Sequence, residues 1–286
     1  MKWIEIDFRI IGPQIDSLLI ASANLIDREW PARWRKFDQA QLLVLGSVKL
    51  SANTYQVIKF LCKDKYFDPW QKREFITAVP PLTRSILDSL FTIVFLFDDV
   101  PSKAELFVQG GWREMCEATE RAERNHGSKP KWVKYLRERA KSMEAMRKKS
   151  NLLPRGPGVR KLPYWPTPGQ MIGWPKLSDD RRTFLTDLND WYYKELSSTA
   201  HLSLPGLLLR ASPLLIQDRE SSEISLRKLK ANCFPLTLCL LLAILSEVQI
   251  EAEFGLADRL KYVWQFLAEY YDQVREIYDM RYRTRL

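Results

Sequence analysis

The residue best suited to acid–base chemistry is His201, one of only two histidines in the 286-residue sequence. Imidazole is the side chain whose ordinary pKa lets it accept and donate protons near neutral pH. The segment from about Ser178 to His201 is expected to form an amphipathic helix, because apolar residues recur every three or four positions (Phe184, Leu188, Trp191, Tyr192). A structural role is the alternative, since a histidine at a helix end can bind the last carbonyl groups.

Two short patterns carry a resemblance to a known family. One is Tyr193-x-x-Leu196-Ser197-x-x-Ala200-His201, and the other is Arg84-Ser-Ile-Leu-Asp88, about a hundred residues upstream. Together they resemble a family of uncharacterised microbial helical proteins related to the HEPN superfamily (higher eukaryotes and prokaryotes nucleotide-binding), over roughly residues 42–250. The resemblance implies an all-α, dimeric protein that binds RNA or a nucleotide. It also implies metal-independent ribonuclease activity in a toxin–antitoxin or antiviral defence system, with a protein partner of that system.

The resemblance also implies roles for single residues. His201, Lys194 and Arg84 would be catalytic, with Ser197, Tyr193 and Asp88 positioning the substrate. The signature of the wider group is an arginine, four to six residues, then a histidine, whereas this chain has Lys194, six intervening residues, then His201. Lysine supplies charge without the planar, two-pronged contact that arginine makes to phosphate. This departure favours an alternative, a non-catalytic scaffold protein in which the histidine motif is a buried packing network.

Arg84 and Asp88 lie on a segment, residues 82–97, that is apolar nearly all round as a helix. Such a helix is expected at the centre of the fold. Because the two residues are four apart, they can pair with each other or meet His201 across the core. A plain ion pair within the helix is the alternative to a functional role.

Positive charge is concentrated in one stretch. The net charge is +9, and residues 129–161 hold twelve Lys or Arg against Glu138 and Glu144, an excess of +10. A helix is expected over 131–150, and three interpretations compete for it: a solvated face, an RNA-binding surface, and a helix on acidic membrane. The interleaved aromatic residues favour RNA, which needs phosphate neutralisation and base stacking. The predicted contacts are Lys131, Lys134, Arg137, Lys141, Arg147, Lys148, Lys149, Arg155, Arg160 and Lys161.

The composition and the positions of glycine and proline predict an all-α, irregular multi-helix bundle in a single domain. Hydrophobic residues make up 46% and charged residues 28% of the chain, and there are only 11 glycines. Ile4, Ile6, Phe8 and Ile10 alternate with charged residues, which predicts a short extended arm before Gly12-Pro13, within an N-terminal part that ends near residue 35. Residues 151–177 hold six prolines and four glycines and predict a long loop between a first helical part (36–150) and a second (178–286).

Several classes of site and location are not expected. The four cysteines form no Cys-x-x-Cys pair, so no metal site is predicted, and no cofactor motif is found. Asp98 and Asp99 precede a proline at a helix-to-helix turn, where capping is favoured over metal binding. Arg121 and His126 are separated by four residues, which fits the signature, but Gly127 and Pro130 make a helix end the preferred interpretation.

The expected location is the cytoplasm, without a membrane. The N-terminus has no signal-peptide core. The most apolar run, 234–245, is about a dozen residues long, and a bilayer span needs about 20. This run is therefore expected to be a core helix.

Overall fold

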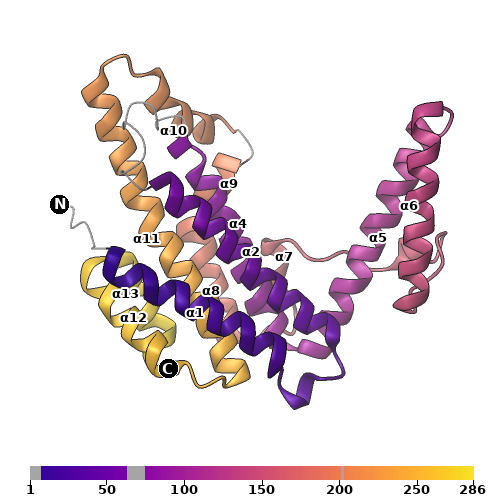
Figure 1. The fold of residues 1–286 in the computed structure, drawn as a ribbon, viewed down its shortest axis with the longest axis horizontal. Helices are drawn as coiled ribbons and strands as arrows, with labels where there is room; N and C mark the ends of the chain where they lie inside the picture. Colours follow the sequence, from indigo (N-terminus) through magenta and orange to yellow (C-terminus); the bar gives the residue numbers. More distant parts are fainter. Residues whose placement is uncertain (1–7, 63–74, 201–202) are drawn as a thin grey trace. The chain divides into compact units, whose positions relative to one another are not determined.

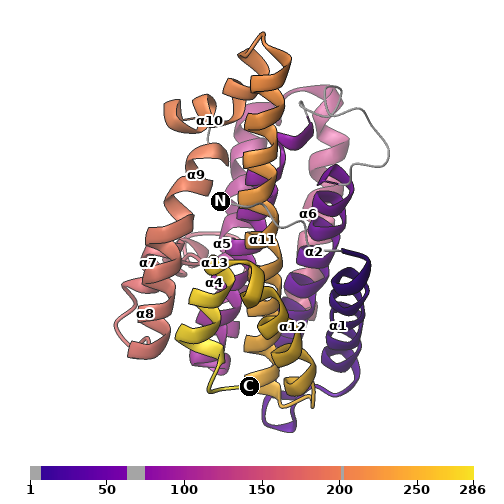
Figure 2. The same cartoon turned by 90° about the vertical axis from the view of Figure 1, so that its left-hand side faces the viewer.

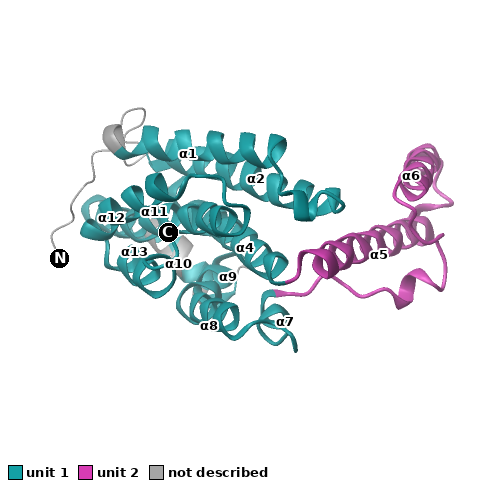
Figure 3. Cartoon of the chain, turned by 90° about the horizontal axis from the view of Figure 1, so that it is seen from below, with its two compact units in different colours: residues 1–98, 168–286 teal, residues 99–167 magenta. Residues whose placement is uncertain are grey.

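All regular structure in the described part of the chain is helical. The computed structural model describes residues 8–62, 75–200 and 203–286, and no strand occurs within these ranges (Figure 1). The all-α prediction is therefore confirmed. The chain forms two compact units: unit 1 is Met1–Asp98 with Pro168–Leu286, and unit 2 is Asp99–Thr167 (Figure 3). The sequence analysis placed no boundary at either junction.

Unit 1 is a bundle of long and short helices. Its elements are α1 (Phe8–Arg28), η1 (Ala32–Trp34), α2 (Asp38–Cys62), α4 (Val79–Asp98), α7 (Pro168–Ile172), α8 (Asp179–Leu188), η3 (Asn189–Tyr193), α9 (Lys194–Ala200), α10 (Leu204–Leu215), α11 (Arg219–Ala252), α12 (Ala257–Tyr270), α13 (Asp272–Ile277) and η4 (Tyr278–Tyr282). Two of these, η3 and η4, are single turns of π-helix.

The core of unit 1 is built on α4 and α11, which pack against each other. Figure 2 shows α11 passing through the middle of the unit, with α1 and α2 on one side and α8 and α9 on the other. The α4 helix is apolar nearly all round, and so is α11 from Phe234 to Leu245, which is why these segments lie inside. Among their few buried polar residues, Thr83 on α4 and Thr237 on α11 are fully buried, and their hydroxyl oxygens lie 2.9 Å apart and satisfy each other.

By length and composition alone, α4 and α11 could each cross a membrane. In the folded unit, 72% of the apolar window of α4 and 94% of that of α11 is buried by other parts of the protein. This burial is what a core helix shows, so the two helices give only weak evidence for a membrane.

The N-terminal prediction is wrong where it can be compared. An extended arm was expected up to Ile10, with Pro13 in the first helical turn, but α1 begins at Phe8 and contains Pro13 in its interior. Ile11 and Ile15, one turn apart, are both fully buried, so helical burial outweighs the short alternating pattern and the bond that Pro13 cannot donate. Residues 4–7 of the expected arm lie outside the described residues.

Helix limits in the C-terminal half do not follow the local pattern. The polar stretch from Arg219 and the apolar run from Phe234 belong to one 34-residue helix, α11, with Pro235 inside it. The C-terminal helical stretch is divided at Tyr271, between α12 and α13, where the backbone is extended. Local pattern does not show this break, because the apolar residues on both sides of it pack against the same core.

Unit 2 is a helical hairpin with a docked loop. Its elements are α5 (Val100–His126), α6 (Pro130–Lys149) and η2 (Val159–Lys161). Asp99 caps α5 by accepting a hydrogen bond from the Ser102 amide at 3.4 Å, which confirms the capping reading for this aspartate. Buried Trp112, Cys116, Met143 and Val159 form a small core that joins both helices to the loop.

The predicted Pro/Gly-rich loop, 151–177, is irregular except for two short helices, η2 and α7, and its part in unit 2 is held along α5. The Trp112 indole donates to the Leu153 carbonyl at 2.9 Å, and the Arg113 guanidinium lies 3.7 Å over the Tyr164 ring. A Cβ on Gly110 would lie 2.5 Å from the Trp165 amide nitrogen, so only glycine allows this approach. The loop therefore completes the core of unit 2.

Candidate functional site

Three residues of the predicted site meet between α4 and η3. Arg84 is only 7% exposed, and its guanidinium carbon lies 3.7 Å from the centre of the Tyr193 ring, in the geometry of a cation–π contact. The same guanidinium forms an ion pair with Asp88, one helical turn along α4. Its buried Nε has no hydrogen-bond partner among the described residues. Arg84, Asp88 and Tyr193 thus form one packed cluster.

The π turn of η3 accounts for the position of Tyr193. A π turn has more residues than an α turn, so consecutive side chains are rotated less relative to each other. Tyr192 is buried and Tyr193 is half-buried, so both neighbouring tyrosines point inward. Burial raises the pKa of Tyr193, and the nearby Arg84 opposes that rise. The ring therefore stays neutral at physiological pH and acts as a stacking surface for Arg84.

Lys194 and Ser197 lie on α9 and take no part in this cluster. Lys194 is exposed and pairs with Asp190, with 2.6 Å between its Nζ and the carboxylate oxygen. This bond lowers the pKa of Asp190. Ser197 is half-buried. His201 lies outside the described residues, so its predicted catalytic role stays a prediction.

The predicted nucleic-acid contacts lie in unit 2, which carries nearly all of the net charge. Residues 99–167 hold 16 Lys or Arg against 8 Asp or Glu, which is +8 of the total of +9. Four of the predicted cations follow one another along α6, are exposed, and form no ion pair with a described residue: Lys131, Lys134, Arg137 and Lys141, here called the α6 cation row. Lys149, also on α6, and Lys161, in η2, are likewise exposed and form no ion pair with a described residue.

The remaining predicted contacts are already paired with carboxylates. Arg155 donates two hydrogen bonds to Glu123 on α5, at 3.1 and 2.6 Å, and Arg160 pairs with Glu120 at 3.0 Å. Arg147 binds Glu144 within α6, and Lys148 lies 4.0 Å from the same carboxylate. Arg155 and Arg160 thus attach the loop to α5, and their charge is less available to a ligand than that of the α6 cation row.

No protein-family model, curated protein or solved structure matches this chain.

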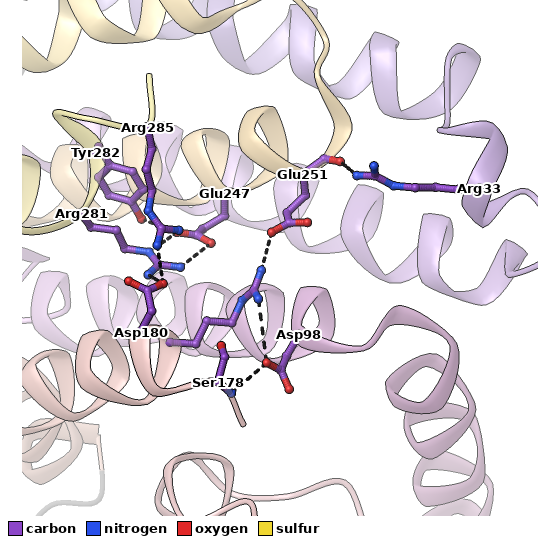
Figure 4. Close-up of polar contacts among 10 residues, drawn as sticks. Arg33, Asp98, Ser178, Asp180, Glu247, Glu251, Arg281, Tyr282 and Arg285 are labelled. Carbon is purple, nitrogen blue, oxygen red and sulfur yellow. Dashed lines mark hydrogen bonds and ion pairs between the residues drawn. The ribbon is translucent and has the colours of Figure 1, made fainter. Parts of the chain in front are cut away.

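A cluster that the sequence analysis missed lies in unit 1, around Glu247 on α11 (Figure 4). Arg281 on η4 donates to both oxygens of the Glu247 carboxylate, at 2.5 and 3.0 Å, and the Tyr282 hydroxyl donates to the same carboxylate at 2.9 Å. Burial works against the charge of Arg281, but its bonds to Glu247 outweigh this and raise its pKa. Burial, followed by the charge of Glu247, raises the pKa of Tyr282.

Further ion pairs extend this cluster to α8. Asp180 accepts hydrogen bonds from Arg281 at 2.7 Å and forms an ion pair with Arg285 at 2.6 Å. The next residue, Arg181, pairs with Glu251 of α11 and lies 3.9 Å from Asp98 at the end of α4 (Figure 4). Asp98 also accepts the Ser178 amide at 3.0 Å, so this aspartate joins α4 to the start of α8.

One sequence signal could have indicated this cluster. Glu247 comes two residues after a run of about a dozen mostly apolar residues, 234–245, so it continues a helix that is otherwise buried. A buried carboxylate requires a cation. The identity of that cation could not be inferred, because Arg281 is 34 residues away and reaches Glu247 through the π turn of η4. Every charge in the cluster has a partner, which indicates a structural role.

Proposed function

We propose that unit 2 binds RNA through the α6 cation row. The observation that carries the proposal is that Lys131, Lys134, Arg137 and Lys141 stay exposed and have no carboxylate partner among the described residues, in a unit where neighbouring arginines are paired. A row of cations spaced along about three turns of helix can neutralise successive phosphates. Affinity for a polyanion would come mainly from the release of its counterions.

The competing membrane interpretation is less well supported by the geometry. A helix that lies on a membrane needs an exposed apolar face to insert among the lipids. In α6 the central apolar residues Leu136 and Met143 are buried, Met143 within the core shared with α5. The α6 helix also exposes Trp132, Val133, Tyr135 and Met146, but exposed charged residues lie between them along the helix, and this mixture suits phosphates and bases better than acyl chains.

The test compares two variants that remove the same charge. One replaces Lys131, Lys134, Arg137 and Lys141 with glutamine, and the control replaces Arg35, Lys36, Lys49 and Lys176, which are exposed cations of unit 1. Both lose three lysines and one arginine. Binding of a labelled RNA at low salt should weaken at least tenfold in the first variant and less than twofold in the control. Equal affinities of the two variants would reject the proposal.

For the region around His201, the contacts of Arg84 favour the packing alternative. Arg84 is buried, stacked on Tyr193 and paired with Asp88, so it already has protein partners. A metal-independent ribonuclease site built on His201, Lys194 and Arg84 remains a separate proposal, supported only by the resemblance. RNA binding by unit 2 does not depend on it.

A further inference from the structure

A cluster of aromatic side chains lies at the closed end of the hairpin in unit 2, beside the turn that joins α5 to α6. The Trp132 indole, at the start of α6, stacks on the His126 ring at the end of α5, with 4.5 Å between ring centres and 17° between the ring planes. Tyr135 meets the indole edge-on at 5.7 Å. Trp132 is 40% exposed and Tyr135 is 48% exposed. Two large aromatic side chains therefore face solvent within one helical turn.

Neighbouring side chains hold the rings of this aromatic cluster in place. Lys129 donates from Nζ to Nδ1 of His126 at 3.2 Å, and Arg139 donates to the Tyr135 hydroxyl at 3.1 Å. Arg139 also donates to Thr119 on α5, at 2.8 Å, which ties the two helices together. His126 covers one face of the indole, and the 40% of Trp132 that stays exposed is the part that a ring from a ligand can contact.

Charge surrounds the exposed rings. Lys131 directly precedes Trp132, Lys134 directly precedes Tyr135, and both lysines are exposed. A nucleotide whose base stacked on Trp132 would therefore place its phosphates near the first two members of the α6 cation row. This combination of stacking surface and cations is the usual basis of binding to single-stranded nucleic acids.

We propose that the ligand of unit 2 is a single-stranded polynucleotide and that one of its bases stacks on Trp132. The inference rests on the proposed RNA binding and narrows it to a class of substrate. In a duplex the base faces are covered by neighbouring pairs, so they cannot reach an indole. Stacking is tolerant of sequence, since every base has an aromatic face. Unit 2 should therefore prefer single strands to duplexes and show little preference for sequence.

The experiment measures the affinity of the whole protein for three labelled ligands of equal length: an oligouridine RNA, an RNA duplex, and an abasic strand that keeps the phosphates. Trp132→Ala should weaken binding of oligouridine by roughly tenfold, within the range measured for loss of one stacked base. Binding of the duplex and of the abasic strand should change less than twofold. Trp132→Phe, which keeps a ring, should stay within about threefold of the wild type for oligouridine.

The outcomes separate this inference from the proposed function. If Trp132→Ala binds all three ligands like the wild type, or weakens all three equally, base stacking on Trp132 is rejected while binding by the α6 cation row can still hold. If replacing that row leaves every affinity unchanged, the proposed function itself is rejected. Should circular dichroism show that Trp132→Ala does not fold, Tyr135→Ala against Tyr135→Phe gives the same comparison, with loss confined to oligouridine expected for the alanine variant.

Discussion

Arg281 and Glu247 form a two-pronged ion pair in the interior of unit 1, with only 2% and 1% of their side chains exposed. The pair connects the C-terminal turn η4 to the central helix α11 (Figure 4). Tyr282 on the same turn stacks on Trp264 of α12, with 5.1 Å between ring centres. The last residues of the chain are therefore part of the core of unit 1, and the ion pair determines where they dock.

Glu247→Gln should destabilise the protein by about 3 kcal/mol, because it leaves the Arg281 charge buried with a weaker partner. Asp180→Asn is the matched control, since it removes another carboxylate bound to Arg281, but one that is 54% exposed. The control should lose about 1 kcal/mol or less. Chemical denaturation measures both values. A loss in Glu247→Gln no larger than that of the control would show that the buried pair does not anchor the C-terminus.

Asp180 should give part of the stability a dependence on acid pH. Burial raises the pKa of this carboxyl, but the attraction of Arg281 and Arg285 outweighs burial and holds the pKa below its ordinary value. A carboxylate whose pKa is lower in the folded state stabilises the fold at any pH above its pKa in the unfolded state, about 4. This contribution is lost as the pH falls through the pKa of the folded state. The free energy of unfolding should fall below about pH 4, less steeply in Asp180→Asn. An equal loss of stability at acid pH in the wild type and in Asp180→Asn would contradict this account.

Two adjacent glycines of α5 should respond in opposite directions to alanine. Gly110→Ala places a methyl group against the backbone of Trp165, so it should detach the loop and destabilise unit 2. Gly111→Ala meets no atom within 4 Å and should stabilise the helix by roughly 0.5–1 kcal/mol. Thermal melting and limited proteolysis of the loop compare the two. Equal effects would mean that the loop does not pack on α5 as described.

His201→Ala tests the ribonuclease proposal. If His201 is a general acid or base, the purified wild type should cleave RNA in the presence of a chelator, and the variant should lose activity by at least a hundredfold. If the histidine motif is instead a packing network, the variant should melt several degrees lower with unchanged RNA affinity. Equal cleavage by both proteins, or none by either while RNA binds, would remove the catalytic assignment.

Parts of the fold that depend on local pattern could be predicted from the sequence. The apolar segment containing Arg84 is the central α4, and the apolar run ending before Glu247 lies in the buried α11. The spacing of Arg84 and Asp88 predicted either a pair within the helix or a contact with His201, and the pair within the helix is present. Such predictions succeed because period and spacing act within one helix.

Contacts between distant residues could not be predicted in the same way. The stacking of Arg84 on Tyr193 depends on a π turn, and nothing in the local pattern of η3 marks the extra residue. The pairing of Arg155 with Glu123 requires the loop to fold back along α5 over 32 residues. Arg155 was therefore predicted as a nucleic-acid contact, whereas its hydrogen bonds to Glu123 show that it also attaches the loop to α5.

The most direct test of RNA binding by the α6 cation row is the salt dependence of affinity. The logarithm of the binding constant for single-stranded RNA, measured over about 50–200 mM salt, should fall with a slope near −0.7 per phosphate contact. Replacing Lys131, Lys134, Arg137 and Lys141 with glutamine should make the slope shallower by up to about 3. The control variant at Arg35, Lys36, Lys49 and Lys176 should keep the wild-type slope. Equal slopes for the two variants would contradict the assignment of the phosphate contacts to α6.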